Sequence, residues 1–576
     1  MAARNYIYKI LLFLMVCLPP VVALFYMINY SVNIPYMDQW DGFLNILVAL
    51  REGSFGFAHL WAQHNEHRIL FPKIIMLFLA LLSHWNVIWE QYFSLFLQIC
   101  TFLLILNIKK LTSPVKQKPV YFLFIIITSM LFFSMVQYEN WVWGWQIQIF
   151  LNIFSATFSI WIIIKYPDNW TGLLLAIVGA IIATYSFANG MIIWAIIFMA
   201  LLLSDITTKK IFIAIWITAA LAVSFSYLYE YEKPLHHPSL FSFINHPLDY
   251  IIFFFSFIGA PMGVCFGLTG SAIIGVTGIS IFIILLLNMV INSQKHPIEK
   301  YIPWICLILY ALITAAITGI GRSGFSANQA LYSRYTSFSL LFWVSLYTMF
   351  LVSKDSFYKK IAYRKLVCLF CALLFSCLII SHSISYSQGI MSFKKHSNRL
   401  SEIRELLKYA KIYGANKSFA YLFPSIPELY ERLDKLRQLK LAVYYKEITT
   451  PSGMYIKGDY FLFNRRSEYQ NFSKNGDLYL EKDHQVSGKI EVSKSINYNL
   501  MSRLLFSSGH GSVMIIIDNS ILGVEDCSSF NKLRDHSEYK WVSFGQIFLS
   551  KGYHTITIKS LGEKSFINAI VLKEKI

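Results

Sequence analysis

An acidic stretch follows the first apolar segment and could supply a catalytic base. It reads NIPYMDQWDGF, and Asp38 and Asp41 would share a face if it were helical, because residues three apart are neighbours on a helix. A carboxylate at the edge of a membrane can take the proton from a hydroxyl nucleophile within hydrogen-bond reach. The alternative is structural, since aspartate also caps helix N-termini. The stretch therefore predicts either a catalytic base or an aspartate that caps a helix N-terminus.

A second polar cluster, HNEHR, follows at 64–68. His64, Glu66 and His67 could ligate a divalent metal, or bind a phosphate or sugar together with Arg68. The H-x-x-H spacing alone is not a zinc signature, so we favour phosphate or sugar binding and predict no metal ligand. A solvated loop before the next apolar run is the structural alternative.

A third loop, QYENWVWGWQIQ at 137–148, combines aromatic and polar side chains. Trp141, Trp143 and Trp145 alternate along it. The flanking polar residues are Glu139, Asn140, Gln146 and Gln148. Flat aromatic faces beside amide and carboxyl groups suit a sugar, whose C–H face is apolar and whose rim carries hydroxyls. The pattern predicts an acceptor-sugar site or an ordinary interfacial aromatic belt.

Two arginines border apolar segments in a fourth loop, GRSGFSANQALYSRY at 321–335. Arg322 and Arg334 lie on the side of the membrane where basic residues are disfavoured, unless each has an anionic partner. A lipid phosphate or pyrophosphate would supply that partner, because guanidinium groups bind phosphate in bidentate geometry. Snorkelling to lipid headgroups is the alternative.

The rest of the chain must position these loops in a membrane. Of 576 residues, 56% are hydrophobic and 14% are charged, and the mean hydropathy is +0.51; soluble proteins carry about 25% charged residues. This composition excludes a soluble globular enzyme, a disordered protein and a nucleic-acid-binding domain. We assign the net charge of +18 to cytoplasmic loops rather than to a nucleic-acid partner.

Apolar runs predict a polytopic α-helical membrane domain over 1–385, with about 11 spans and a retained first anchor. The run 171–204 is long enough for two short helices hinged at Asn189-Gly190, and glycines and a proline interrupt 248–268, which we predict not to span. With basic loops inside, the N-terminus is cytoplasmic and the C-terminal region lies outside. The clear candidates are 7–30, 86–108, 119–136, 144–165, 209–229, 271–292, 301–320, 336–352 and 363–384.

After residue 385 the pattern changes twice. Helical spacing over 397–414 and 424–440 predicts a helical linker region at 386–457. From 458 to 576, about eight short stretches of period two, beginning with GDYFLF, predict an extracytoplasmic β-sandwich or jelly roll.

The membrane part resembles the GT-C glycosyltransferase superfamily, on the strength of the YMDQWD, HNEHR, ENWVWGWQ and GRSG…SRY loops. It looks most like the bacterial inner-membrane enzymes that decorate O-antigen, the outer part of lipopolysaccharide, or other surface glycans. The resemblance implies inverting transfer of a sugar from a polyprenyl-phosphate donor to a glycan or lipid acceptor on the outer face. It places the base at Asp38 or Asp41 and leaves a divalent metal open as a cofactor. Separately, WVSFGQIFLSKGYHTITIKSLGEKSFINAIVL resembles the closing strands of carbohydrate-binding sandwich modules. That resemblance implies that the C-terminal domain holds the acceptor glycan; the alternative is that it only caps or stabilises the membrane domain.

The arginines of these loops would bind the phosphate of such a donor. Arg68, Arg322 and Arg334 would hold the leaving phosphate, whose negative charge grows as the glycosidic bond breaks. A surface-polysaccharide polymerase and a lipid-linked-glycan flippase or transporter are the alternatives. The sequence contains no Walker loop, and intramembrane acidic residues are nearly absent between 86 and 352, which disfavours ion-coupled transport.

Overall fold

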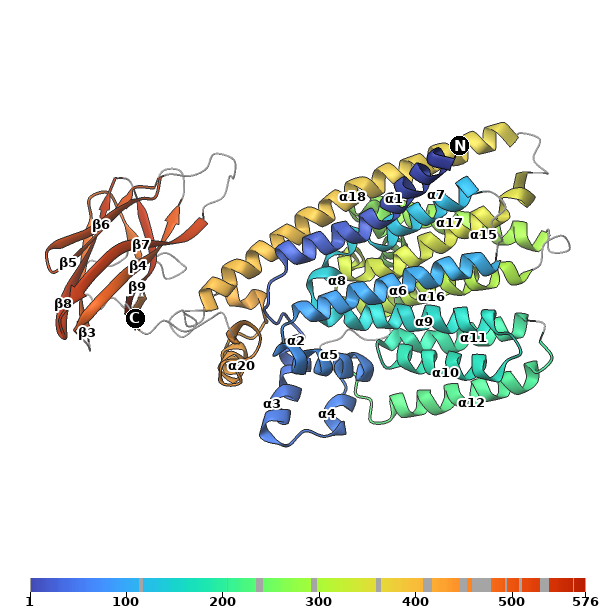
Figure 1. Ribbon diagram of the computed structural model, residues 1–576, viewed down its shortest axis with the longest axis horizontal. Helices are drawn as coiled ribbons and strands as arrows, with labels where there is room; N and C mark the ends of the chain where they lie inside the picture. Colours follow the sequence, from blue (N-terminus) through green and yellow to red (C-terminus); the bar gives the residue numbers. More distant parts are fainter. Residues whose placement is uncertain are drawn as a thin grey trace. The chain divides into compact units, whose positions relative to one another are not determined.

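The computed structural model describes residues 2–112, 118–204, 206–234, 242–291, 298–358, 364–407, 417–445, 453–457, 478–492, 495–506, 510–528, 538–562 and 564–574. The chain is mostly helical and ends in a sheet region (Figure 1). It forms two compact units, a helical unit of residues 1–402 and 421–445 and a unit of residues 403–420 and 446–576 that contains the sheets.

Long apolar helices make up most of the helical unit. Within the described residues, eight are long and apolar enough to cross a membrane, and three more apolar helices are shorter. The helices are α1 (Ala2–Tyr30), α2 (Gln39–Gly42), α3 (Leu44–Glu52), α4 (Phe57–Trp61), α5 (Leu70–Ser83), α6 (Ile88–Thr112), α7 (Lys118–Phe132), α8 (Tyr138–Val142), α9 (Ile147–Lys165), α10 (Trp170–Thr184), α11 (Ile192–Leu203), α12 (Lys209–Leu228), α13 (Ser242–Asn245), α14 (Pro247–Gly263), α15 (Gly267–Ile291), α16 (Ile302–Arg322), α17 (Thr336–Tyr358), α18 (Arg364–Leu407) and α20 (Ile426–Gln438).

The segment 171–204 forms two short helices, as predicted. α10 and α11 are joined by a 3₁₀ turn at Ala188–Met191, which contains Asn189 and Gly190. A Cβ atom at Gly190 would lie 2.0 Å from the carbonyl oxygen of Ala183. The hinge therefore requires glycine, because the two backbone segments approach too closely for any side chain.

The segment 248–268 differs in part from its prediction. α14 runs unbroken through Gly259 and Pro261, and the break falls in a 3₁₀ turn at Val264–Phe266. At the start of α14, the ring of Tyr250 lies beside Gly319 near the end of α16, and Val264 after its end lines a cavity with Tyr332. Both ends of α14 thus lie near the connection from α16 to α17, and that the segment does not span the membrane stays a prediction.

The predicted final span and the first linker helix are one element. α18 extends over 44 residues, from Arg364 to Leu407, and the rest of the predicted helix at 397–414 lies outside the described residues. α20 confirms the helix predicted at 424–440. It packs on the helical unit, where Arg432 forms an ion pair with Asp41.

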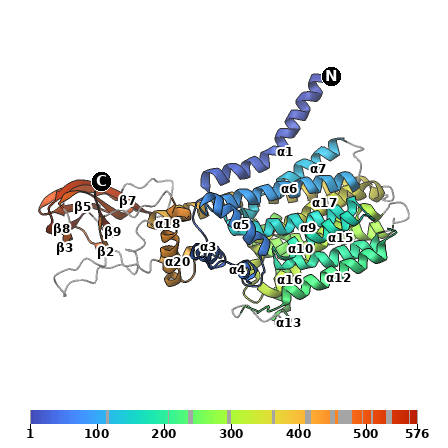
Figure 2. The ribbon, with the colours of Figure 1, turned by 60° about the horizontal axis from the view of Figure 1, so that its bottom comes forward.

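The loops of the helical unit gather at two ends (Figures 1 and 2). One end collects the loop after α1, the α7–α9 and α10–α11 connections, the end of α12 and the α16–α17 connection, because residues from all of these line one cavity. At the other end, Trp304 Nε1 donates to Thr112 Oγ1 (3.2 Å), and Asp168 accepts hydrogen bonds from Thr207 and Thr208. We call these the cavity end and the basic end.

The sheet unit holds two antiparallel sheets around one hydrophobic core. One sheet has the order β1-β9-β4-β7, with β2 also paired to β9, and the other has the order β3-β8-β5-β6. Alternate residues such as Leu500, Leu504, Val513 and Ile515 are buried in the shared core, which explains the period-two pattern. The strands are β1 (Gly453–Lys457), β2 (Leu478–Leu480), β3 (Gln485–Val492), β4 (Ile496–Phe506), β5 (Ser512–Ile517), β6 (Ser520–Asp526), β7 (Glu538–Leu549), β8 (Gly552–Leu561) and β9 (Ser565–Glu574).

Two strands were not predicted. β1 lies within the segment expected to be a helical linker, and β6 is an edge strand whose side chains are mostly exposed, so its pattern does not alternate. The predicted strand GDYFLF lies outside the described residues.

Candidate functional site

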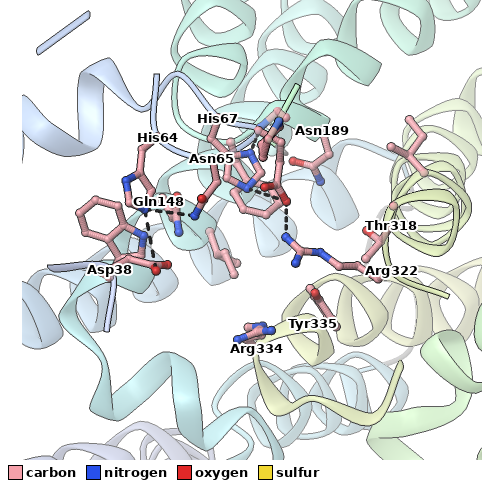
Figure 3. A pocket seen from close by; sticks show the side chains of 18 of the residues that line it. Asp38, His64, Asn65, His67, Gln148, Asn189, Thr318, Arg322, Arg334 and Tyr335 are labelled. Atoms are coloured by element: carbon pink, nitrogen blue, oxygen red, sulfur yellow. Dashed lines mark hydrogen bonds and ion pairs between the residues drawn. The ribbon is translucent and has the colours of Figure 1, made fainter. Parts of the chain in front are cut away.

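A cavity of about 700 Å³ opens at the cavity end. This volume lies within the range of about 300–1,000 Å³ that is usual for small-molecule sites. Figure 3 shows Asp38 and His64 on one side, His67 and Asn189 on another, and Arg322, Arg334 and Tyr335 facing them. The loops that the sequence singled out therefore converge on one hollow.

Asp38 is held by its two neighbours. The backbone N–H of Met37 donates to the carbonyl of Leu422 (2.8 Å), and the side chain of Gln39 donates to the buried carboxylate of Glu90 (2.7 Å). Asp38 precedes α2 but makes no capping hydrogen bond with its side chain. Its carboxylate lines the cavity and is 38% exposed, so it can reach a ligand there.

His64 lies beside Asp38 and is packed against an indole ring. His64 Nε2 is 3.8 Å from Asp38 Oδ1, and its ring meets the ring of Trp145 edge to face at 5.0 Å. Behind that indole, a Cβ atom at Gly42 would lie 2.2 Å from Trp145 Cη2. Gly42 and Trp145 thus fix the side of the cavity that carries Asp38.

Glu66 links two predicted residues from distant parts of the chain. Its Oε1 forms an ion pair with Arg322 and lies 3.6 Å from His67 Nε2. His67 Nδ1 accepts a hydrogen bond from the backbone N–H of Ala188 (3.2 Å), and its ring stacks on Phe187 at 4.1 Å. Burial lowers the pKa of His67 to about 4, so the ring is neutral at pH 7 and its proton lies on Nε2, facing Glu66.

Arg334 is a cation that lines the cavity and can bind a ligand. Its backbone is fixed, because its N–H donates to Glu139 Oε2 (3.0 Å) and its carbonyl accepts from Asn140 Nδ2 (3.0 Å). Its guanidinium lies over the rings of Tyr332 and Tyr335, at 4.8 and 5.3 Å, and lines the cavity. Among the described residues, no carboxylate lies within ion-pair distance of it.

Four predicted site residues do not line the cavity. Asp41 forms an ion pair with Arg432; burial raises the pKa of its carboxyl, and the guanidinium opposes that shift. Arg68 is buried and donates to backbone carbonyls, including those of Tyr227 (2.8 Å) and Tyr229 (2.5 Å). Its donors thus tie the first loop to the end of α12. The other two are Asn140 and Trp141, both fully buried.

The tryptophans offer little open surface to a sugar. Trp143 and Trp145 line the cavity, but they are only 6% and 1% exposed. Trp143 Nε1 donates to the carbonyl of Tyr36 (3.0 Å), and Trp141 Nε1 donates to that of Ser134 (3.1 Å). These rings mainly hold the loops in place.

The sequence analysis noted Gln146 and Gln148 beside the tryptophans and Asn189 in a hinge without placing them in the site, and it missed further lining residues. Three buried amides, Gln146, Gln148 and Asn189, belong to the wall, and within the described part of the chain their side-chain oxygens accept no hydrogen bond. Isolated amides inside or beside apolar runs were the signal that could have identified them. The further polar lining residues that were missed are Tyr36, Asn65, Tyr227, Tyr231, Lys233, Thr318 and Tyr335.

The cavity combines both signs of charge. Asp38, Glu66 and Glu139 face Arg322, Arg334 and Lys233 across its walls. In the described ranges, no group of three or more His, Cys, Asp or Glu residues could hold a metal ion. The arrangement can bind an anionic group at Arg334 and accept a proton at Asp38.

Comparisons with known proteins assign no function to this site. No protein-family model and no curated protein matches the chain. A GH26-CBM35 β-(1,4)-mannanase of Podospora anserina matches 22% of this chain and 28% of its own, with 16% identity and a TM-score of 0.17. A Paenibacillus xanthan lyase matches 22% of this chain and 12% of its own, with 19% identity and a TM-score of 0.16. A family GH115 4-O-methyl-α-glucuronidase specific for decorated arabinogalactans matches 48% of this chain and 33% of its own, with 10% identity and a TM-score of 0.20. The chain spans 12% to 33% of the length of these proteins. At these TM-scores, none of them bears on the fold or function of this chain.

Proposed function

We propose that the protein is an integral-membrane glycosyltransferase of GT-C type. It transfers a sugar from a polyprenyl-phosphate donor to a surface glycan, such as O-antigen, or to a lipid acceptor. The observation that carries this proposal is the cavity that joins the available carboxylate of Asp38 to the guanidinium of Arg334, which lacks a carboxylate partner in the described chain.

The walls of the cavity match the parts of such a donor. Arg334 suits the lipid phosphate, because guanidinium binds phosphate oxygens through several donors at once. The amides of Gln146, Gln148 and Asn189 suit the sugar hydroxyls, which donate as well as accept hydrogen bonds. Arg322 is already paired with Glu66, so its role is to hold the first loop and add positive potential.

The reaction is a single displacement. The acceptor hydroxyl oxygen attacks the anomeric carbon on the face opposite the phosphate, while the bond from that carbon to the phosphate oxygen breaks. The phosphate leaves with the electron pair, beside Arg334, and the hydroxyl proton passes to Asp38. The configuration at the anomeric carbon is therefore inverted.

The proposal places the protein in the inner membrane of a bacterium. The N-terminus and the basic end are cytoplasmic, and the cavity end faces outward, in keeping with the positive-inside rule. We assign the two-sheet region to the outside as a sandwich that holds the acceptor glycan.

The test is mass analysis of surface glycan from cells that carry the wild-type gene, the Asp38→Asn variant or no gene. We expect one added sugar mass per repeat with the wild type and a loss of at least about 100-fold with Asp38→Asn, the lower end of the range for one acid–base group. Both proteins should reach the membrane in equal amounts.

Asp41→Asn is the matched control. Asp41 lies three residues from Asp38 but pairs with Arg432 outside the cavity, so most of the transfer activity should remain. Substantial activity in Asp38→Asn would reject Asp38 as the base. Altered chain length at unchanged repeat mass would point to a polymerase, and no change in either would point to a flippase or transporter.

A further inference from the structure

A second, smaller cavity lies on the other side of the wall that carries Glu139. Its volume is about 300 Å³, at the lower end of the range for ligand sites. Its polar lining comes from hydroxyl and amide side chains together with Glu139. The members that matter here are Tyr138, Glu139, Tyr332, Ser333, Ser385 and Gln388.

The wall between the two cavities is rigidly bonded. It consists of α8 and the 3₁₀ turn at Ser333–Tyr335. Ser333 Oγ accepts from the backbone N–H of Glu139 (3.1 Å) and donates to the carbonyl of Val136 (2.8 Å). Glu139 Oε2 accepts from the backbone N–H of Arg334 (3.0 Å), and the Glu139 side chain lines both cavities. A ligand in the second cavity would therefore lie next to the residue whose guanidinium enters the first.

One hydroxyl of the second cavity has no hydrogen-bond partner among the described residues. Ser385, on α18, is fully buried, and its Oγ forms no hydrogen bond with any part of the chain that the structure describes. Buried polar groups are rarely left in this state, because water or a ligand usually completes their hydrogen bonds. Ser385 marks a place where a polar ligand can bind.

The charges that line the second cavity favour a neutral ligand over an anionic one. Among its described lining residues there is no lysine or arginine, and Glu139 is the carboxylate. An anionic ligand would be repelled there, whereas hydroxyl groups can donate to Glu139 and both donate to and accept from Ser385 and Gln388. A neutral sugar unit fits these requirements.

We propose that the second cavity binds one neutral sugar unit of the acceptor, and that Glu139 positions it beside the cavity of Asp38 and Arg334. The acceptor role rests on the proposed function, whereas sugar binding itself does not. The assignment moves acceptor recognition from the buried tryptophans to residues of α18 and the α16–α17 connection.

The experiment uses the purified full-length protein and four neutral probes, namely glucose, galactose, mannose and N-acetylglucosamine, with glucuronate as the anionic comparison. Thermal unfolding over a concentration series gives an apparent affinity for each. Ser385→Leu fills the cavity, and Gln388→Ala removes an amide without adding volume. Ser387→Leu is the matched control, because Ser387 is exposed on the same helix and lies outside the cavity.

We expect at least one neutral sugar to stabilise the wild type, and glucuronate to do so more weakly. Ser385→Leu should weaken that affinity at least tenfold and Gln388→Ala severalfold, with Ser387→Leu unchanged. Stabilisation by none of the neutral sugars would overturn the proposal. The proposal would also be overturned if Gln388→Ala and a folded Ser385→Leu both bound the neutral sugar with the affinity of the wild type.

The same variants separate acceptor binding from donor turnover. In membranes, Ser385→Leu should lower transfer to surface glycan at least tenfold but leave release of sugar from the lipid donor to water within about twofold. An equal loss of both would place Ser385 in the donor site and overturn the acceptor assignment. A wild type that binds sugar through Ser385 but turns over no donor would reject the proposed function and retain the sugar site.

Discussion

Neighbouring polar residues in the loop after α1 have opposite environments, and this decides which of them can act. Asp38 reaches the cavity, whereas Asp41 is tied to Arg432. His67 also lines the cavity, whereas the guanidinium of Arg68 donates its hydrogen bonds to backbone carbonyls. The helix that was expected to align the two aspartates begins only at Gln39 and has four residues. Chemical type and spacing therefore identified a loop that lines the cavity, but not which of its residues do so.

The buried state of His67 predicts a dependence on pH. Its pKa is about 4 in the folded protein and near 6.5 in the unfolded chain, so only the unfolded chain takes up a proton between these values. This stability contribution is complete above about pH 6.5 and declines as the pH falls towards 4. We expect the apparent Tm to fall between pH 7.5 and 5, and to fall less in His67→Gln, whose side-chain oxygen can still accept from the backbone N–H of Ala188 without titrating.

Thermal unfolding of both proteins in detergent at the two pH values measures this difference. His396 also has its pKa lowered to about 4 by burial, so part of the decline should remain in the variant. His396→Gln, alone and combined with His67→Gln, separates the two contributions. If His67→Gln lost as much stability on acidification as the wild type, His67 would not be a buried neutral group.

At the scale of elements, glycines decide how α14 and α15 meet. A Cβ atom at Gly275 would lie 1.9 Å from the carbonyl oxygen of Phe255, and one at Gly259 would lie 1.9 Å from that of Ser271. The two helices thus pack backbone against backbone, as small residues permit in membranes. In the sequence Gly259 looks like a helix breaker, because a sequence does not reveal which surface a glycine faces.

Gly275→Val should separate these two helices. The contact is with backbone, which cannot move aside as a flexible side chain can, so overpacking should cost at least about 1–3 kcal/mol. We expect a lower yield of monodisperse protein by size-exclusion chromatography and a lower apparent Tm. Ile273→Val, at a site that is 62% exposed on the same helix, is the control and should behave as the wild type does. A Gly275→Val protein that matched this control would contradict the close approach of the two backbones.

Side-chain pairs between distant parts of the chain could not be predicted from the sequence. Glu66 meets Arg322 across 256 positions of chain, and Asn140 meets Ser337 across 197. Apolar runs reliably gave the helices, and alternation gave most of the strands, because both are local patterns. Which loops share an end follows from the alternation of helices, but which side chains touch depends on packing that no local pattern records.

At the scale of the whole helical unit, several lysines and the cavity lie at opposite ends. α9 starts beside the cavity and runs for 19 residues, about 28 Å at 1.5 Å per residue, to Lys165 at the basic end. Lys109, Lys110 and Lys209 also lie at helix ends away from the cavity. If lysines mark the cytoplasmic side, the cavity opens outward, where lipid-linked sugars and surface glycans meet.

Labelling of single cysteines tests this orientation. In a variant whose eight cysteines are replaced, Glu52→Cys places a thiol at an exposed position of α3 at the cavity end, and Pro167→Cys places one between α9 and α10 at the basic end. We expect a membrane-impermeant maleimide to label Glu52→Cys in intact spheroplasts and Pro167→Cys only after permeabilisation. Both sites are exposed, so accessibility within the fold cannot cause the difference. The reverse pattern would put the cavity in the cytoplasm, where nucleotide sugars rather than polyprenyl-linked sugars would be at hand, and the proposed donor would have to be abandoned.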